Sequence, residues 1–241
     1  MNRTLLVLMS LTLLPCEPTV GLAANPQSSP RVRPGDTQKQ RESEIQYLNQ
    51  YGRQALLQAV IAGDTQVARE LLNDSIDVDA RDEYGQTPLM LTDDRELCAR
   101  LIVHGADVNA KTSYGRTPLM QAVWFVRIDL LSLLIGAGAD VTARDYGADT
   151  ALIVAASRGE NCAIDLLISA GADPNERIAD GTTVLIRSAS YGHADNVRAL
   201  IDHGADINLA DQVGKTALDY ARETEHGEIA RLLEAAARNR K

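Results

Sequence analysis

The sequence predicts an all-α solenoid of about six helix–turn–helix repeats joined by β-turn fingers. Two observations carry this prediction. Threonine recurs every 33 residues, at Thr117, Thr150, Thr183 and Thr216, and each one precedes an apolar run. The tripeptide Gly-Ala-Asp occurs four times at the same spacing, first at residues 105–107. A repeat of this length is typical of stacked two-helix units, in which each unit packs only against its neighbours.

The repeat at residues 111–143 explains how its residues form these elements. Gly115 suits a tight turn, because glycine adopts a positive φ without a side-chain penalty. Thr117 and Pro118 suit a helix start, where the hydroxyl can cap and proline loses no hydrogen bond. Gly138 suits the left-handed end of a second helix. The unit is therefore turn, helix, turn, helix, turn.

The array is predicted to span residues 53–236, with a basic tail at 237–241. The first repeat, to about residue 81, is an amino-terminal cap without a Thr-Pro start, and the sixth, from 210, is a polar carboxy-terminal cap. Repeat two, at 82–110, is three residues short at the end of its first helix. Asp93 and Asp94 stand there and, with the following Arg-Glu, resemble a capping box for the second helix.

These motifs resemble the ankyrin repeat family, whose period is about 33 residues and whose signature is T-P-L-H-x-A. The resemblance covers roughly residues 54–235 and implies an ankyrin-repeat solenoid. The sequence departs from the family at the histidine of that signature. We therefore expect apolar packing to replace most of the usual polar bridge between repeats. The residues in the histidine slot are Met90, Met120, Ile153, Ile186 and Asp219.

The amino terminus has the form of a cleavable export signal at residues 1–23. A short positive start precedes a 12-residue apolar run, and small residues follow. An uncleaved membrane anchor is the alternative. Residues 24–36 are polar and proline-rich, which predicts a disordered tether. The pattern over 37–52 permits a helix that would cap the open end of the array. Because exported soluble arrays fit a bacterium best, we expect a periplasmic protein, or alternatively a secreted one.

Charge and cysteine spacing limit the partners and the covalent chemistry. The net charge is −9, so we do not expect nucleic acid as a partner. No segment is long and apolar enough to form a permanent membrane span, so we expect no membrane association after signal cleavage. We also expect a monomer. Cys98 and Cys162 lie two repeats apart, which exceeds disulfide geometry. We expect two separate, largely buried thiols.

No catalytic, cofactor or metal constellation is apparent. Two of the four histidines, His104 and His203, occupy the same helix-end slot, where a cationic side chain is favourable for structural reasons. The sequence contains no phosphate loop, nucleophile elbow or Cys/His ligand cluster. We therefore expect no enzymatic activity and no cofactor, and we look for function on the surface.

The resemblance implies that finger tips and the ends of the first helices line a concave face. The only tryptophan and the only phenylalanine of the chain, Trp124 and Phe125, lie side by side in the helix-end slot of repeat three. Such rings concentrate binding energy at protein interfaces. Three consecutive tips carry a tyrosine, the third shifted by one position, and another tyrosine occupies the helix-end slot two repeats after that of Trp124 and Phe125. These are Tyr84, Tyr114, Tyr146 and Tyr191.

Two interpretations of Trp124 and Phe125 remain open. The rings can anchor a partner, or they can fill the space left by the shortened helix of repeat two. Asp93 and Asp94 can likewise add acidic complementarity to a basic partner, or simply cap a helix. The sequence thus predicts a non-enzymatic scaffold in the bacterial periplasm that binds another protein, such as a toxin or a resident enzyme. The alternative is a secreted effector that binds a host protein.

Overall fold

The computed structural model describes residues 53–72 and 76–239, which form six pairs of α-helices and no strand. The predicted signal peptide (1–23), tether (24–36) and capping helix (37–52) lie outside the described residues. The first helices of the pairs are α2 (Arg53–Ile61), α4 (Pro88–Leu91), α6 (Pro118–Trp124), α8 (Ala151–Arg158), α10 (Val184–Ser190) and α12 (Ala217–Glu223). The second helices are α3 (Thr65–Leu71), α5 (Arg95–Val103), α7 (Ile128–Gly136), α9 (Asn161–Ser169), α11 (Ala194–Asp202) and α13 (Gly227–Asn239).

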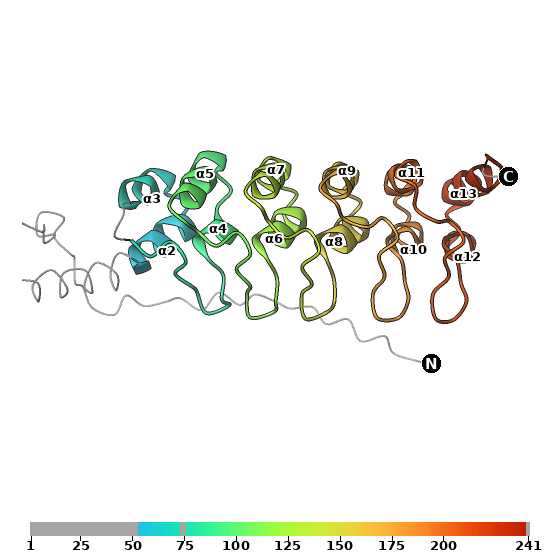
Figure 1. Ribbon diagram of the computed structural model, residues 1–241, viewed down its shortest axis with the longest axis horizontal. Coiled ribbons are helices and arrows are strands. Elements are labelled where there is room, and N and C mark those ends of the chain that lie inside the picture. The colour runs from blue at the N-terminus through green and yellow to red at the C-terminus, as the bar shows by residue number, and fades with distance from the viewer. Residues whose placement is uncertain (1–52, 73–75, 240–241) are drawn as a thin grey trace, which may run out of the picture. The chain divides into compact units, whose positions relative to one another are not determined.

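The helix pairs stack in sequence order (Figure 1). First helices form one row, second helices form another, and the loops that join successive pairs project together beyond the first row. We call each of these loops a finger. None of the helices in the described part is long and apolar enough to cross a bilayer. The observed solenoid confirms the predicted all-α fold of repeated helix pairs.

Threonine starts the first helices as predicted. The hydroxyls of Thr117, Thr150, Thr183 and Thr216 each accept a hydrogen bond from the backbone N–H three residues later, which satisfies one unpaired donor of the first turn. Gly138 ends the α7 repeat with φ +87°, in the left-handed region expected for it. The motifs read from the sequence therefore form the predicted local structures.

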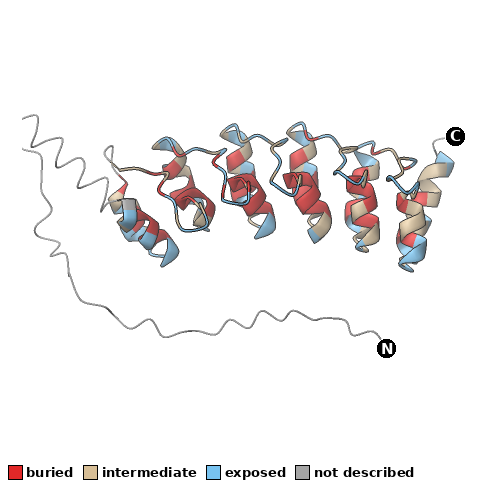
Figure 2. Ribbon diagram, turned by 90° about the horizontal axis from the view of Figure 1, so that it is seen from below, coloured by how far each residue is buried: buried red, intermediate tan, exposed pale blue. Residues whose placement is uncertain are grey.

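The core lies between the two rows of helices (Figure 2). Residues of both rows that face each other are buried, whereas helix ends and fingers are largely exposed. Four of the five residues that replace the signature histidine are among the most buried in the chain: Met90, Met120, Ile153 and Ile186. This agrees with the prediction that apolar packing replaces the histidine. Asp219, the fifth, forms a capping box with Thr216 instead.

The fingers supply part of the polar connection between repeats. The backbone N–H of Ser113 donates to the carbonyl of Tyr84 at 2.9 Å, and that of Tyr146 donates to the carbonyl of Tyr114 at 3.1 Å. These bonds connect the first three fingers of the array side by side. The tyrosine-bearing tips are thus held in register by their own backbone.

Two details differ from the prediction. Cys98 is buried and its thiol is free, but the Cys162 thiol is free and exposed, so the expectation of two buried thiols is wrong for Cys162. The buried positions of α9 begin one residue later, at Ala163 and Ile164, which turns Cys162 toward solvent. The boundary predicted at residue 236 falls inside α13, which continues to Asn239.

Candidate functional site

Residues from two fingers and one helix end surround a pocket of about 200 Å³. Tyr84 and Tyr114 come from successive fingers, and Trp124 and Phe125 come from the end of α6. The structure therefore brings together four of the residues that the sequence singled out. We call this site the aromatic pocket, and its complete lining is Tyr84, Gln86, Thr112, Tyr114, Arg116, Gln121, Trp124 and Phe125.

Both rings at the end of α6 are exposed rather than part of the core. The exposed fraction is 38% for Trp124 and 53% for Phe125. Val126, the next residue, is also exposed and adopts φ +59°, a conformation that is strained for a β-branched side chain. Three consecutive apolar residues therefore face solvent at this point of the array.

Arginines surround the two rings. The guanidinium carbon of Arg116 lies 4.7 Å from the centroid of the Trp124 ring, and that of Arg158 lies 4.9 Å from the same centroid. The Arg127 guanidinium lies 4.7 Å from the Phe125 centroid. Each distance is within the range of a cation–π interaction. The pocket thus combines flat apolar rings with positive charge.

Arg127 occupies the space left by the shortened helix of repeat two. Helix α4 ends at Leu91, and Arg127 Nη1 donates to the carbonyls of Met90 and Thr92, each at 3.1 Å. Its Nη2 atom forms an ion pair with Asp93. A guanidinium rather than an aromatic ring therefore contacts the end of α4, which leaves the Trp124 and Phe125 rings at the surface.

Asp93 and Asp94 have partners within the protein and line no part of the aromatic pocket. Asp94 caps α5 by accepting from the Leu97 N–H at 2.6 Å, and it forms an ion pair with Arg69 at 2.9 Å. The Leu97 hydrogen bond is the largest influence that lowers the pKa of the Asp94 carboxyl. Both carboxylates thus help to hold repeats one to three together.

Tyr146 and Tyr191 also lie outside the pocket lining. Tyr146 is 78% exposed, and its ring lies against the backbone of Gly115, where an added Cβ would meet it at 2.8 Å. The one-residue shift predicted for this tip accounts for the different placement, since Ala148 rather than a glycine takes the positive φ of the turn. Tyr191 is stacked on His193, with ring centroids 6.2 Å apart.

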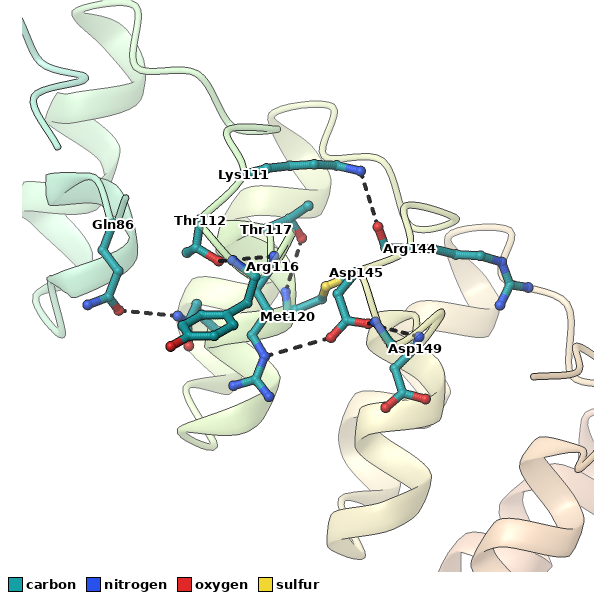
Figure 3. A network of polar contacts seen from close by, with 12 residues as sticks. Gln86, Lys111, Thr112, Arg116, Thr117, Met120, Arg144, Asp145 and Asp149 are labelled. Carbon is teal, nitrogen blue, oxygen red and sulfur yellow. Dashed lines mark hydrogen bonds and ion pairs between the residues drawn. The ribbon is translucent and has the colours of Figure 1, made fainter. Parts of the chain in front are cut away.

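Polar contacts connect residues of the pocket lining to neighbouring repeats (Figure 3). Gln121 Nε2 donates to Gln86 Oε1 at 3.2 Å, which connects α6 to the preceding finger. Arg116 points toward Asp145 of the next finger, with 3.7 Å between Nε and Oδ2. The sequence interpretation did not include Gln86 or Arg116. Their shared position, directly before the threonine that starts each first helix, is the pattern that could have identified them.

The remaining carboxyl groups form no apparent centre for acid–base or metal chemistry. Burial raises the pKa of Glu176, which accepts a hydrogen bond from the Thr150 hydroxyl, and burial likewise raises the pKa of Asp149. Within residues 53–72 and 76–239, no group of three histidine, cysteine or acidic side chains could hold a metal ion. The arrangement that stands out is therefore a surface suited to binding.

Comparisons with known proteins agree with this architecture. A model of ankyrin repeats in three copies matches residues 36–112 and 150–240, and one of many copies matches residues 101–155. No protein of curated function matches the sequence significantly.

Solved structures of similar proteins give the same result. The ankyrin repeat protein EF0377 is 31% identical, with a TM-score of 0.70 over 75% of this chain and 96% of its own. An ankyrin repeat domain from Acinetobacter baumannii AYE is 34% identical, with a TM-score of 0.69 over 76% of this chain and 97% of its own. Ankyrin repeats indicate a protein–protein interaction scaffold, and proteins of this type are generally non-enzymatic. The chain belongs to the ankyrin repeat family.

Proposed function

We propose that this protein is a non-enzymatic scaffold in the bacterial periplasm that binds a partner protein on the concave face formed by its fingers and first helices. The observation that carries the proposal is the aromatic pocket. Exposed Trp, Tyr and Phe side chains gathered at one point are costly in water unless a partner covers them, and such residues dominate binding energy at interfaces. Trp124 and Phe125 act as anchors, and Tyr84, Tyr114 and Tyr146 act as rim contacts.

The periplasmic location rests on the sequence of residues 1–23, which has the charge, apolar run and small residues of a cleavable signal. The similarity to a domain from Acinetobacter baumannii is consistent with a bacterial source. Fractionation of the producing cells, with amino-terminal sequencing of the mature chain, tests this part. Mature protein in the periplasmic fraction supports it, and mature protein in the medium favours a secreted effector that binds a host protein.

Two kinds of periplasmic partner fit a rigid binding face. One is a toxic enzyme that the scaffold neutralises, as an immunity protein would. The other is a resident enzyme that the scaffold stabilises or assembles. A neighbouring toxin or enzyme gene distinguishes these roles, because partners of this kind are commonly encoded together.

The test of the binding face is a cross-linking pull-down from the periplasmic fraction with three proteins. These are the wild type, the Trp124→Ala, Phe125→Ala double variant, and a control with Val67→Ala and Val103→Ala. Val67 and Val103 are exposed apolar residues of the second helices α3 and α5, and they line no part of the pocket. Circular dichroism verifies that each variant is folded.

We expect the wild type and the valine control to retain the same protein, and the folded aromatic variant to lose it. Equal retention by all three would contradict the proposed site, since the partner would then bind elsewhere on the array.

A further inference from the structure

We propose that the aromatic pocket recognises a short acidic segment of the partner protein. An apolar side chain of that segment enters the pocket, and a neighbouring aspartate or glutamate pairs with Arg116 and Arg158. This inference rests on the proposed function and specifies the chemistry of the partner. Asp93 and Asp94 alone would favour a basic partner, but their carboxylates pair within the protein, and the inferred partner segment is acidic instead.

The charges beside the pocket are positive and incompletely paired. Arg116 and Arg158 both lie within 5 Å of the centre of the Trp124 ring, at 4.7 and 4.9 Å. The Arg116–Asp145 contact, at 3.7 Å, is longer than a hydrogen bond. Arg158 is exposed and forms no ion pair with any described residue. Arg116 lines the pocket and Arg158 lies outside its lining, and each guanidinium has donors available for a carboxylate of a partner, which the opposite charge favours.

Arg127, in the same region, has a guanidinium group whose partners lie within the protein. It forms an ion pair with Asp93 and donates to the carbonyls of Met90 and Thr92. Its donors are therefore already engaged, whereas the fork-shaped groups of Arg116 and Arg158 remain available. Arginine binds carboxylates through two parallel hydrogen bonds when its geometry permits, which makes such contacts specific as well as strong.

Gln121 favours a peptide over a free anion. Its exposed fraction is only 7%, and it lines the pocket. Its side-chain nitrogen donates to Gln86 Oε1, but no donor among the described residues pairs with Gln121 Oε1. This oxygen can accept a hydrogen bond at the pocket, and an extended peptide offers backbone N–H groups that can take the place of water there. The pocket thus has an acceptor for the backbone as well as cations for a side chain.

The dimensions of the pocket fit one side chain of a longer segment. Its volume of about 200 Å³ is below the roughly 300–1,000 Å³ of typical small-molecule sites. The segment would continue across the exposed rings of Tyr114 and Phe125, which line the pocket. Because the chain carries a net charge of −9, recognition of an acidic segment depends on these local arginines rather than on the overall charge.

The test selects binders from a display library of random 12-residue peptides on the immobilised full-length chain. Each enriched peptide is then titrated against the protein while the fluorescence of Trp124, the only tryptophan, is followed. The variants are Arg116→Gln, Arg158→Gln, and a matched control, Arg231→Gln, on the exposed surface of α13. Dependence on Trp124 and Phe125 is scored by display enrichment on the Trp124→Ala, Phe125→Ala double variant, which has no tryptophan to follow. Circular dichroism confirms that all are folded.

We expect enriched peptides to carry Asp or Glu beside an apolar residue. Changing that carboxylate to the amide should weaken binding about tenfold, which corresponds to about 1.4 kcal/mol. Arg116→Gln and Arg158→Gln should weaken the acidic peptide to a similar extent and leave the amide version unchanged, while Arg231→Gln has no effect. The Arg116→Glu, Arg158→Glu double variant should instead select peptides with Lys or Arg.

Two outcomes overturn the inference. Enriched peptides that require Trp124 and Phe125 but lack carboxylates, or that bind the arginine variants as tightly as the wild type, contradict the acidic segment and leave the proposed binding face intact. A library without any peptide dependent on Trp124 and Phe125 also overturns the inference, and the pull-down then decides the proposed function separately.

Discussion

Three neighbouring residues at the end of α6 define the site at the scale of single side chains. Trp124, Phe125 and Val126 are all exposed, and Val126 adopts a backbone conformation that glycine occupies at the corresponding turns after α2 and α8. Exposed apolar groups and a strained backbone both cost stability. Such costs occur more often at functional sites than elsewhere, because a stable scaffold can tolerate them there.

The exposure of the two rings predicts a modest loss of stability on their removal. The Trp124→Ala, Phe125→Ala double variant should lower the free energy of unfolding by about 2 kcal/mol in total, less than the roughly 3–5 kcal/mol that either ring costs when fully buried. Leu119→Ala, at a fully buried position of the same helix, is the matched control and should cost about 3 kcal/mol. Urea denaturation measures the free energy of unfolding of the wild type and of both variants. A loss above 5 kcal/mol in the double variant would mean that the rings form core.

The positive φ of Val126 predicts that Val126→Gly stabilises the protein. A left-handed conformation costs a non-glycine residue roughly 1–2 kcal/mol, and the greater freedom of unfolded glycine offsets about half of that gain. We expect a net increase of about 0.5–1 kcal/mol in the free energy of unfolding. Gly63→Ala, at the equivalent turn with open space around it, should have the opposite sign. A destabilised Val126→Gly variant would show that packing of the valine outweighs the strain.

At the scale of elements, the shortened helix α4 and residue Arg127 depend on each other. Helix α4 has four residues, whereas α6 has seven. The missing turn would leave the carbonyls of Met90 and Thr92 without donors from their own repeat, and Arg127 of repeat three supplies them. A deletion in one repeat is thus compensated by a side chain of the next.

We expect removal of the Arg127 side chain to lower the free energy of unfolding by more than its partly exposed position suggests. Arg127→Ala should lower the free energy of unfolding by about 2–3 kcal/mol, because hydrogen bonds to charged groups contribute roughly 1.5–3 kcal/mol. Arg127→Lys should recover little, since lysine lacks the planar fork. Asp93→Asn tests the exposed ion pair alone and should cost less than about 0.5 kcal/mol. If Arg127→Lys matched the wild type, charge alone would account for the contact.

The carboxyl of Glu176, which accepts a hydrogen bond from Thr150 at the start of α8, predicts that the stability of the protein depends on pH. Burial raises the pKa of Glu176 above its ordinary value of 4.5. A carboxyl whose pKa is higher in the folded state binds its proton more tightly there, so its ionised form lowers stability above the folded pKa. This cost disappears as the pH falls below the unfolded value. Glu176→Gln keeps an oxygen that can accept from Thr150 and cannot ionise.

We therefore expect Glu176→Gln to be more stable than the wild type at pH 7, with a difference that shrinks toward pH 4. Thermal unfolding across this range measures the difference, and Glu228→Gln on the exposed face of α13 serves as the control. A difference that stays constant with pH would assign the effect to packing instead of ionisation.

At the scale of the whole molecule, the fold could be predicted from the sequence because each repeat has its own local determinants. Threonine caps, glycine turns and the 33-residue spacing all specify the same unit, and neighbouring units then stack. The exposure of Cys162 follows from the same spacing, because residue 162 occupies the slot of Asp129 and Asp195, which are both exposed, and not the buried slot of Cys98. The spacing therefore specifies which side of a second helix is buried, whereas the end of the last helix, at Asn239, has no following repeat to define it.

The aromatic part of the site could be predicted for the same reason, since Tyr84, Tyr114, Trp124 and Phe125 occupy repeat slots that come together in the stack. The contacts of Arg127 could not, because they join residues 35 and 37 positions apart. They also depend on a deletion whose structural consequence is not visible in the sequence. Charge around the rings is a property of the assembled array, and it decides which partner chemistry is favoured.

The most direct test of the account places a photo-cross-linking amino acid, p-benzoylphenylalanine, at position 125 or at position 103 in the producing cells. Position 125 borders the aromatic pocket, whereas position 103, which is even more exposed, lies at the end of α5 and outside the pocket lining. Irradiation should yield one specific cross-linked protein from position 125 and none from position 103. Specific cross-linking from position 103 alone would contradict the claim that the aromatic pocket is the binding site of this scaffold.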